Sequence, residues 1–507
     1  MSRQRVILVT LGIMLSLFMA SMEATVIATA MPTIVGQLGG LAIYSWVFSA
    51  FMLTSTTTVP VFGKLSDIYG RRPVYAAAMA LFLIGSFLCG AAQSMPQLIA
   101  FRALQGLGAG GIIPLAFTLI GDMFNLEQRA KMQGLFSGVW GVSSIVGPLL
   151  GGFLVDQISW HWVFYINLPL GLVAVGLVWL GWRDKPAEPG TTAPKVDYAG
   201  AILLTAGVVA LLMGLFELGT FLGWGLLILA TLLLIALGWV EWRAADPILP
   251  LHLFRDRIFA AACSQGGFAG WAMFGSLSFV PLFVQAVLGT SATVAGATLT
   301  PMILSWVFAS IIGSRLLLHL SYRNMALLGM GLLTLGTLLM AGIGVNSSQM
   351  NLMVNLALMG TGMGLSIPAF LITVQSTVPA RDLGAATSTL QFSRSIGGVL
   401  GVSVMGTVLS FRLASRLAEA GLDSATISID SLLDPMTQAT TSMVLEGTLR
   451  EALAGAIQGV FVIAFIAAAL GLVATAFAPP GRIAQLVAQR TGAKSPSQAA
   501  PTSASGK

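Results

Sequence analysis

Long uncharged apolar stretches, each about the length of a membrane-crossing helix, constrain this chain more than any other feature. The first begins at Val6 and meets no charge until Glu23. A bilayer core about 30 Å thick is crossed by roughly 20 apolar residues in a helix. Charged residues make up 9% of the chain, whereas soluble domains hold about 25%. The sequence therefore predicts an all-α polytopic membrane protein.

Fourteen stretches are long enough to cross the membrane. Their approximate limits are 6–30, 45–62, 74–92, 97–120, 132–155, 162–182, 198–218, 223–242, 258–287, 293–318, 325–345, 352–378, 385–411 and 452–478. An even count puts both chain ends on one side, and nearly all lysines and arginines then fall on that side. The exceptions are Arg102 and Arg394 within spans, and Arg412, Arg416 and Arg450 on the other side. The positive-inside rule thus favours cytoplasmic N and C termini, and the scatter of basic residues argues against nucleic-acid binding.

An internal repeat divides the chain into two halves. The segments "GLGAGGIIP" (106–114) and "GTGMGLSIP" (360–368) share three glycines and a proline at the same spacing, in spans that run inward. Repeated halves are a transporter architecture, with substrate sites between them. We expect an N-terminal six-helix bundle (1–182), a linker with two inserted helices (183–257), a C-terminal six-helix bundle (258–478) with an external loop (412–451), and a disordered cytoplasmic tail (479–507).

The segment "GKLSDIYGRR" (63–72) resembles the loop signature between helices 2 and 3 of the major facilitator superfamily. Its glycines permit a tight turn, and its aspartate is suited to pair with an arginine or to face a helix N-terminus. The resemblance implies a latch between the halves, in which Arg71 meets an acid at the inner end of span 4, where Asp122 stands. The expected latch residues are Gly63, Asp67, Gly70, Arg71, Arg72 and Asp122. The alternative is an ordinary basic loop with a helix cap.

The segment "GVWGVSSIVGPLLGG" (138–152) in span 5 resembles the motif that marks antiporters in this superfamily. Its glycines are expected to form a smooth groove for another helix, and its proline permits a bend. The motif residues are Gly138, Gly141, Gly147, Pro148, Gly151 and Gly152. Ordinary packing of small residues is the competing explanation, although a tightly packed groove also suits a surface where the halves move.

Three further stretches are similar to signatures of the fourteen-helix drug/proton antiporter branch of the superfamily. They are "MEATVIATAMP" (22–32), "SWHWVFYINLPLG" (159–171) and "QFSRSIGGVLG" (391–401). The first has Glu23 in place of the branch's aspartate and Ala28 in place of its asparagine. The resemblance implies the major-facilitator fold, with two six-helix bundles plus two inserted helices, and a multidrug efflux activity.

Glu23 is the candidate proton-coupling residue, because it is one of very few acids within a span. A carboxylate that alternately meets water and apolar surroundings changes its proton affinity with conformation. Arg102, in a "RALQGLGAG" segment that resembles the family's helix-4 motif, is expected to face the interior with a partner and to tune Glu23. Two alternatives remain. Arg102 snorkels toward the surface, or Glu23 is a structural carboxylate paired permanently with Arg102 or with the Thr25 hydroxyl.

A substrate cavity between the halves is expected from polar and aromatic side chains on the spans. The candidates are Thr25, Gln105, Trp271, Phe274, Trp306, Gln391 and Arg394. Aromatic rings accept large apolar or cationic guests, and a carboxylate favours positive charge. Packing in the core or against lipid is the alternative for each aromatic residue.

These features favour a proton-coupled antiporter that exports hydrophobic or cationic compounds across the cytoplasmic (inner) membrane by alternating access. Separated histidines and the absence of catalytic motifs argue against an enzyme, so the proton gradient, with no cofactor or metal, is expected to drive the cycle. The expected partners are the lipid bilayer, protons and small amphipathic or cationic substrates, with the chain acting as a monomer. Export of one endogenous lipid, siderophore or metabolite is the main alternative, ahead of proton-coupled uptake or a non-transport receptor.

Overall fold

The computed structural model describes residues 2–39, 43, 46–184, 197–244, 247–290, 292–419 and 443–491. This part of the chain is helical, and no strand occurs in it. Much of the expected linker, external loop and tail, at 185–196, 420–442 and 492–507, lies outside the described residues. The all-helical architecture is the one predicted for a polytopic membrane protein.

Each expected span coincides with one long helix or with two consecutive helical segments. The first six spans correspond to α1 (Arg3–Leu38), α2 (Trp46–Tyr69), α3 (Arg71–Gly90), α4 (Met95–Met123), α5 (Leu126–Gln157), and α6 (Trp162–Tyr165) with α7 (Asn167–Gly181). The inserted spans are α8 (Tyr198–Phe216) and α9 (Phe221–Arg243). The rest are α10 (Arg257–Leu282) with the π-helix η3 (Phe283–Val287), α11 (Ala292–Leu316), α12 (Tyr322–Ala341), α13 (Gln349–Thr377), α14 (Leu383–Glu419) and α17 (Met443–Ala476). Two short 3₁₀ segments, η2 (Leu251–Arg255) and η4 (Ala380–Asp382), precede α10 and α14.

Twelve helices of the described chain are long and apolar enough to cross a membrane, judged by length and composition. Among the long helices, α2 and α5 are not in this set. Hydroxyl residues at 54–58 lower the hydropathy of α2, whereas the apolar stretch of α5 contains positions 144, 145 and 148, whose side chains lie outside the described residues. The count of fourteen spans therefore stays a prediction.

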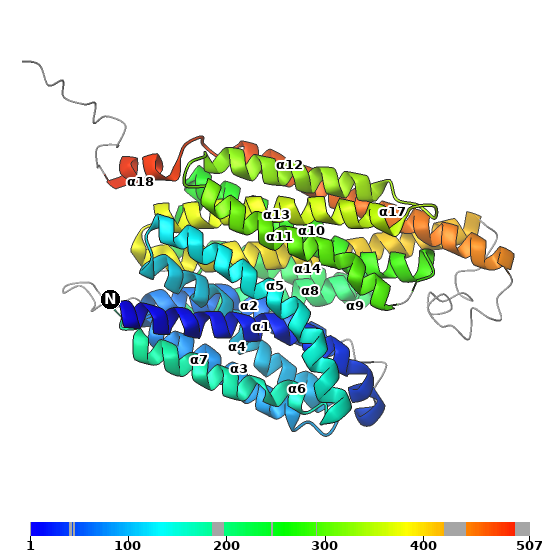
Figure 1. The fold of residues 1–507 in the computed structure, drawn as a ribbon, viewed down its shortest axis with the longest axis horizontal. Helices are drawn as coiled ribbons and strands as arrows, with labels where there is room; N and C mark the ends of the chain where they lie inside the picture. Colours follow the sequence, from blue (N-terminus) through cyan, green and yellow to red (C-terminus); the bar gives the residue numbers. More distant parts are fainter. Residues whose placement is uncertain are drawn as a thin grey trace, which may run out of the picture.

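Two sets of helices meet along a shared interface. In the first set α1 packs against α4, α5 and α7, and in the second α10 packs against α14 and α17. The sets meet where α2 packs against α14 and where α5 packs against α11. Figure 1 shows the first set in blue and cyan and the second in green to orange, largely on opposite sides of this interface.

The repeated glycine motif makes the same contacts in both sets. On α4, Gly106 and Gly110 lie against the backbone of α2, whereas Gly108 lies against α3. On α13, Gly360 and Gly364 lie in the same way against α11, and the glycine between them lies against α12. A side chain at these positions would collide with backbone atoms, so the close approach depends on glycine. Helices α2, α3 and α4 thus correspond to α11, α12 and α13, as the sequence repeat predicts.

The inserted helices α8 and α9 pack against each other, and α8 also contacts the interface between the two sets. Leu204, Val208 and Leu212 of α8 are buried in one cluster with Leu53 of α2 and Val399 of α14. Helix α8 therefore lies across the junction of the halves.

The tail departs from its expected disorder at its start. Residues Ile483–Thr491 form a further helix, α18, which packs against α13. Ile483 is buried in the core cluster and Leu486 packs against it, so apolar residues hold this helix in place. Figure 1 shows α18 and the beginning of α1 at the same end of the bundle, which we call the α18 end.

Candidate functional site

The charge in the first helix has a partner inside the first set of helices. Glu23 on α1 and Arg102 on α4 are each 2% exposed, and Arg102 Nη1 lies 2.6 Å from Glu23 Oε1. Arg102 Nε also donates to the Val47 carbonyl at 3.3 Å, and its guanidinium lies 4.0 Å from the centre of the Phe51 ring. Arg102 therefore faces the protein interior, and the snorkelling alternative is wrong for this structure.

Three neutral side chains complete the shell around this pair. Gln105 Nε2 donates to Glu23 Oε1 at 2.8 Å, and Asn167 Nδ2 donates to Glu23 Oε2 at 2.6 Å. Ser86 Oγ accepts hydrogen bonds from both amides, at 3.2 Å from Gln105 and 3.0 Å from Asn167. Both oxygens of the Glu23 carboxylate are thus hydrogen-bonded, which offsets the cost of burying its charge.

The sequence did not indicate that Asn167 and Ser86 lie beside Glu23, and it placed Gln105 among the candidates for the substrate cavity. Asn167 stands in the stretch "YINLPLG", which is similar to a family signature. That similarity could have marked Asn167 as a functional residue, but it does not indicate contact with Glu23. Gln105 belongs to the Glu23 shell and is not among the residues that line the cavity described below. The side chain of Thr25, the other candidate partner of Glu23, lies outside the described residues.

The segment 63–72, which runs from the end of α2 into α3, joins the halves at the α18 end. Arg71 Nη1 lies 2.5 Å from Asp67 Oδ1, and Arg71 Nε lies 2.9 Å from Asp122 at the end of α4. Asp67 also accepts the backbone N–H groups of Gly384, at 3.0 Å, and Ala385, at 2.7 Å, which open α14. Asp67 therefore both pairs with an arginine and faces a helix N-terminus, so one carboxylate connects the two sets of helices.

Two neighbours in this segment behave differently from the expectation. Gly70 has φ of 91° and makes the turn between α2 and α3, but Gly63 lies inside α2, where a side chain would collide with Ser388 and Gly384 of α14. Gly63 thus permits close helix approach and forms no turn. Arg72 takes no part in the pairing, because its guanidinium lies 3.9 Å from the centre of the Trp179 ring.

A second group of contacts, which the sequence did not indicate, joins the halves at the same end. Arg129 at the start of α5 donates to the Gln375 carbonyl of α13 at 2.7 Å and to Ser376 Oγ at 3.1 Å. Gln375 Nε2 donates to the Phe117 carbonyl of α4 at 3.0 Å. Burial lowers the pKa of the Arg129 guanidinium from its usual value, and nearby Asp122 opposes this shift. The α18 end is therefore closed by hydrogen bonds between the two sets.

The glycines of α5 form part of the expected groove. Gly141 is buried, and a Cβ there would lie 3.0 Å from Val307 of α11. Gly147 and Gly151 are buried as well. At Gly138 and Gly152 no atom lies within 4 Å of where a Cβ would stand, so a close helix contact at these two positions is absent from this structure. The helix runs through position 148, where the Pro148 side chain lies outside the described residues.

A cavity of about 240 Å³ opens between the two sets of helices. Its expected lining residues Phe274, Trp306 and Arg394 are present, on α10, α11 and α14. Phe136 and Trp140 of α5, which were not predicted, line the facing wall. The full lining is Phe117, Gln133, Phe136, Ser137, Trp140, Met273, Phe274, Leu277, Met302, Ile303, Trp306, Val307, Ser310, Ile367, Pro368 and Arg394. Among the described residues that line it, Arg394 is the one charged side chain, and Glu23 lies elsewhere.

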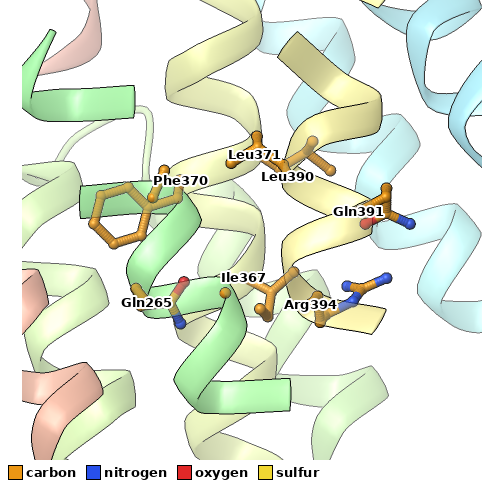
Figure 2. Close-up of a pocket in the computed structure, with 9 residues that line it drawn as sticks. Gln265, Ile367, Phe370, Leu371, Leu390, Gln391 and Arg394 are labelled. Atoms are coloured by element: carbon orange, nitrogen blue, oxygen red, sulfur yellow. The ribbon is translucent and has the colours of Figure 1, made fainter. Parts of the chain in front are cut away.

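A smaller hollow of about 20 Å³ adjoins Arg394 inside the second set. Figure 2 shows Gln391 and Arg394 projecting to one side of α14, with Gln265 and Phe370 on the other side of the hollow. Gln391 therefore lies beside the cavity residue Arg394 without lining the larger cavity itself. Trp271, by contrast, packs against Gly401 of α14 and is not among the residues that line the larger cavity in this structure.

This arrangement defines a class of protein. An all-helical membrane protein with repeated halves, a cavity between them and a buried charge pair has the architecture of a secondary transporter. The sequence model of the Major Facilitator Superfamily matches residues 13–402 of the chain. The chain belongs to this superfamily, and it is a multi-pass transporter rather than an enzyme.

Curated relatives carry names from drug transport. The multidrug transporter protein MdtP of Bacillus subtilis (strain 168) is 39% identical over 423 residues, which cover 82% of this chain and 77% of the relative. Multidrug resistance protein 3 of the same organism is 38% identical over 418 residues, or 81% of each chain.

Solved structures share the fold. A proton:xylose symporter, XylE, superposes with a TM-score of 0.63 at 11% identity, covering 95% of this chain and 98% of its own. The human organic anion transporter MFSD10 superposes with a TM-score of 0.62 at 14% identity, covering 92% and 100%. At these identities the likeness concerns the fold alone.

Proposed function

We propose that this chain is a proton-coupled antiporter that exports hydrophobic or amphipathic small molecules across the cytoplasmic membrane by alternating access. The names of the bacterial relatives support drug export. Dedicated export of one metabolite is the second candidate, because another relative, 31% identical over 433 residues, is named as the MFS-type transporter of the acurin A biosynthesis cluster of Aspergillus aculeatus. We take the transporting unit to be a monomer with both termini in the cytoplasm.

The observation that carries the proposal is the buried pair of Glu23 and Arg102, each 2% exposed. A buried carboxylate depends on a cation and hydrogen-bond donors around it to carry a charge. Protonation removes the charge, so the attraction that holds Arg102 against Glu23 is lost. Because α4 carries both Arg102 and the contacts with α2 and α3, a proton on Glu23 can change how the first set of helices packs.

The closed α18 end fits one step of an alternating-access cycle. If this end faces the cytoplasm, as the basic loops predict, the structure is closed toward the cytoplasm through Asp67, Arg71 and Arg129. In this state substrate is released to the outside and a proton enters from the outside. The contacts of Asp67, Arg71 and Arg129 separate only afterwards. The same contacts must break when the transporter opens inward, so they set the balance between the two states.

The test is dye transport into proteoliposomes, with neutral, cationic and anionic aromatic dyes and an imposed pH gradient. The wild-type chain is expected to move at least one dye against its gradient when the pH gradient has the direction of antiport. Glu23→Gln is expected to abolish the response to the gradient while downhill dye exchange continues. Glu127→Gln, at a surface carboxylate 63% exposed, is the matched control and should transport like the wild type. A full response in Glu23→Gln would contradict the proposal.

A further inference from the structure

Arg394 is the second arginine within an expected span, and it takes no part in the pair of Glu23 and Arg102. Counted from Leu383 at about 1.5 Å per residue, it lies roughly 16 Å along α14. That distance is about half of a hydrocarbon core of about 30 Å. The residue is half-buried and lines the cavity between the halves. An arginine at this depth is costly unless it has a partner or a function.

The described part of the chain supplies no counter-charge for Arg394. Its side chain makes no ion pair or hydrogen bond with any residue in the described parts of the chain. The sequence contains no acid between Arg257 and Arg381, and none in α14 before Glu419. The acids of α17, Glu446 and Glu451, stand near the start of that helix, so the described part of the second set of helices offers no carboxylate at the depth of Arg394.

The acids of the facing set are also occupied or distant. Glu23 is held by Arg102, and Asp122 at the end of α4 is held by Arg71. On α5, which forms the facing wall, Glu127 and Asp156 stand near the two ends of the helix, away from the cavity residues at 133–140. Among the described residues, the cavity thus presents one positive charge, that of Arg394, with no opposite charge beside it.

The walls around Arg394 are suited to a flat apolar body. Trp306 and Phe274 lie on one side of the cavity, and Phe136 and Trp140 lie on the other. Aromatic walls bind aromatic and large apolar groups, while a single charged group fixes their orientation. A guanidinium binds carboxylate and sulfonate groups through paired N–H donors.

We propose that the cavity binds aromatic or amphipathic substrates that carry one anionic group, a carboxylate or sulfonate, which pairs with Arg394. This inference rests on the proposed export function and names its substrate class. It replaces the expectation of cationic substrates, which depended on a carboxylate in the cavity. The substrate supplies the counter-charge that the described residues around Arg394 lack, and a cation in the same place meets repulsion from Arg394.

The test compares dyes with one ring body and different charge. N-phenyl-1-naphthylamine is neutral, its 8-sulfonate is anionic, and ethidium is an aromatic cation. Binding is measured by equilibrium dialysis to the full chain in nanodiscs of phosphatidylcholine, with protein-free nanodiscs subtracted. The wild type is expected to bind the sulfonate more tightly than the neutral dye and the cation. Arg394→Gln is expected to weaken the sulfonate about tenfold or more and the neutral dye less than threefold. Arg394→Lys should restore most of the sulfonate affinity.

Arg3→Gln, which removes an exposed arginine at the start of α1 that is not among the cavity lining residues, is the control and should bind all three dyes like the wild type. Unchanged sulfonate affinity in Arg394→Gln, or an equal loss for both ring-matched dyes, would overturn the proposal. Tighter binding of ethidium than of the sulfonate by the wild type would overturn it as well, whether or not the variants fold. Gradient-driven transport of the neutral dye reports separately on the export function, so each idea can fail alone.

Discussion

A single carboxylate, Glu23, is stabilised by one guanidinium and two amides at 2.6–2.8 Å. Arg102 and Gln105 stand one turn apart on α4, and Asn167 stands on α7. The cost of an unpaired charge in an apolar interior makes the whole shell necessary, because removing one partner leaves a buried charge partly unsatisfied. Both the fold and the proposed coupling therefore depend on neutral residues beside the ion pair.

Asn167→Leu tests this dependence. The change removes the donor to Glu23 Oε2 and also the hydrogen bond to Ser86 Oγ. We expect a loss of about 1–3 kcal/mol in stability, together with weaker gradient-driven transport. The measurement is the unfolding midpoint in detergent, with dye transport in proteoliposomes. Stability and transport equal to the wild type would show that Asn167 contributes nothing to the shell.

The sequence allowed the charged members of this site to be predicted, because an acid or an arginine in an apolar span requires an explanation. Glu23 and Arg102 were identified on that ground, and they are in contact. Asn167 and Ser86 escaped prediction because neutral polar residues are common in spans and carry no comparable cost. The cavity was predicted through Phe274, Trp306 and Arg394, but its facing wall on α5 depends on how the halves pack, which one sequence does not reveal.

At the scale of helices, the contact between α2 and α14 holds the α18 end closed. It combines the Asp67 carboxylate at the first N–H groups of α14 with a close approach at Gly63. Each expected span coincides with a helix of the structure in chain order, but the helices extend beyond the apolar limits. Helix α1 continues to Leu38 and α14 to Glu419, because backbone hydrogen bonding propagates past the apolar segment on which the predictions were based.

Gly63→Ala tests the close approach. The added methyl group collides with Ser388 and the Gly384 carbonyl, so α2 and α14 must separate at this end. We expect a destabilisation of about 1–3 kcal/mol and a shift toward the conformation open at the α18 end. Spin labels at the start of α3 and the start of α14 measure the shift as a longer distance component.

The control for this change is Gly238→Ala on α9, where no atom lies within 4 Å of the added Cβ. It should leave both stability and label distances nearly unchanged, or stabilise the helix slightly, because alanine favours helix. If Gly63→Ala behaves like Gly238→Ala, the close approach has no role in holding the α18 end closed.

At the scale of the whole molecule, the repeat relates α2–α4 to α11–α13, and the halves meet through α2 with α14 and α5 with α11. Composition and repeat spacing made this architecture predictable, because apolar length sets the spans and shared glycine spacing sets the helix packing. The sequence does not show which residues from opposite halves meet, and Arg129 with Gln375 is an example. Membrane topology remains a prediction that labelling can test.

Cysteines introduced at Arg3, Ile43 and Tyr69 test the topology and the span formed by α2. All three positions are exposed, and the native Cys89 and Cys263 are buried, so background labelling is low. An impermeant maleimide added to intact cells should label position 43, and should label positions 3 and 69 after permeabilisation. Labelling of 43 and 69 from the same side would show that α2 does not cross the membrane.

The central claim, that Glu23 couples protons to export, is tested most directly by proton flux that a substrate gradient drives. Proteoliposomes holding a pH-sensitive dye inside receive a gradient of a transported compound, with the membrane potential clamped. The account predicts that the wild type and Glu127→Gln move protons opposite to the substrate, and that Glu23→Gln moves substrate without protons. Proton flux in Glu23→Gln equal to that of the wild type would contradict it.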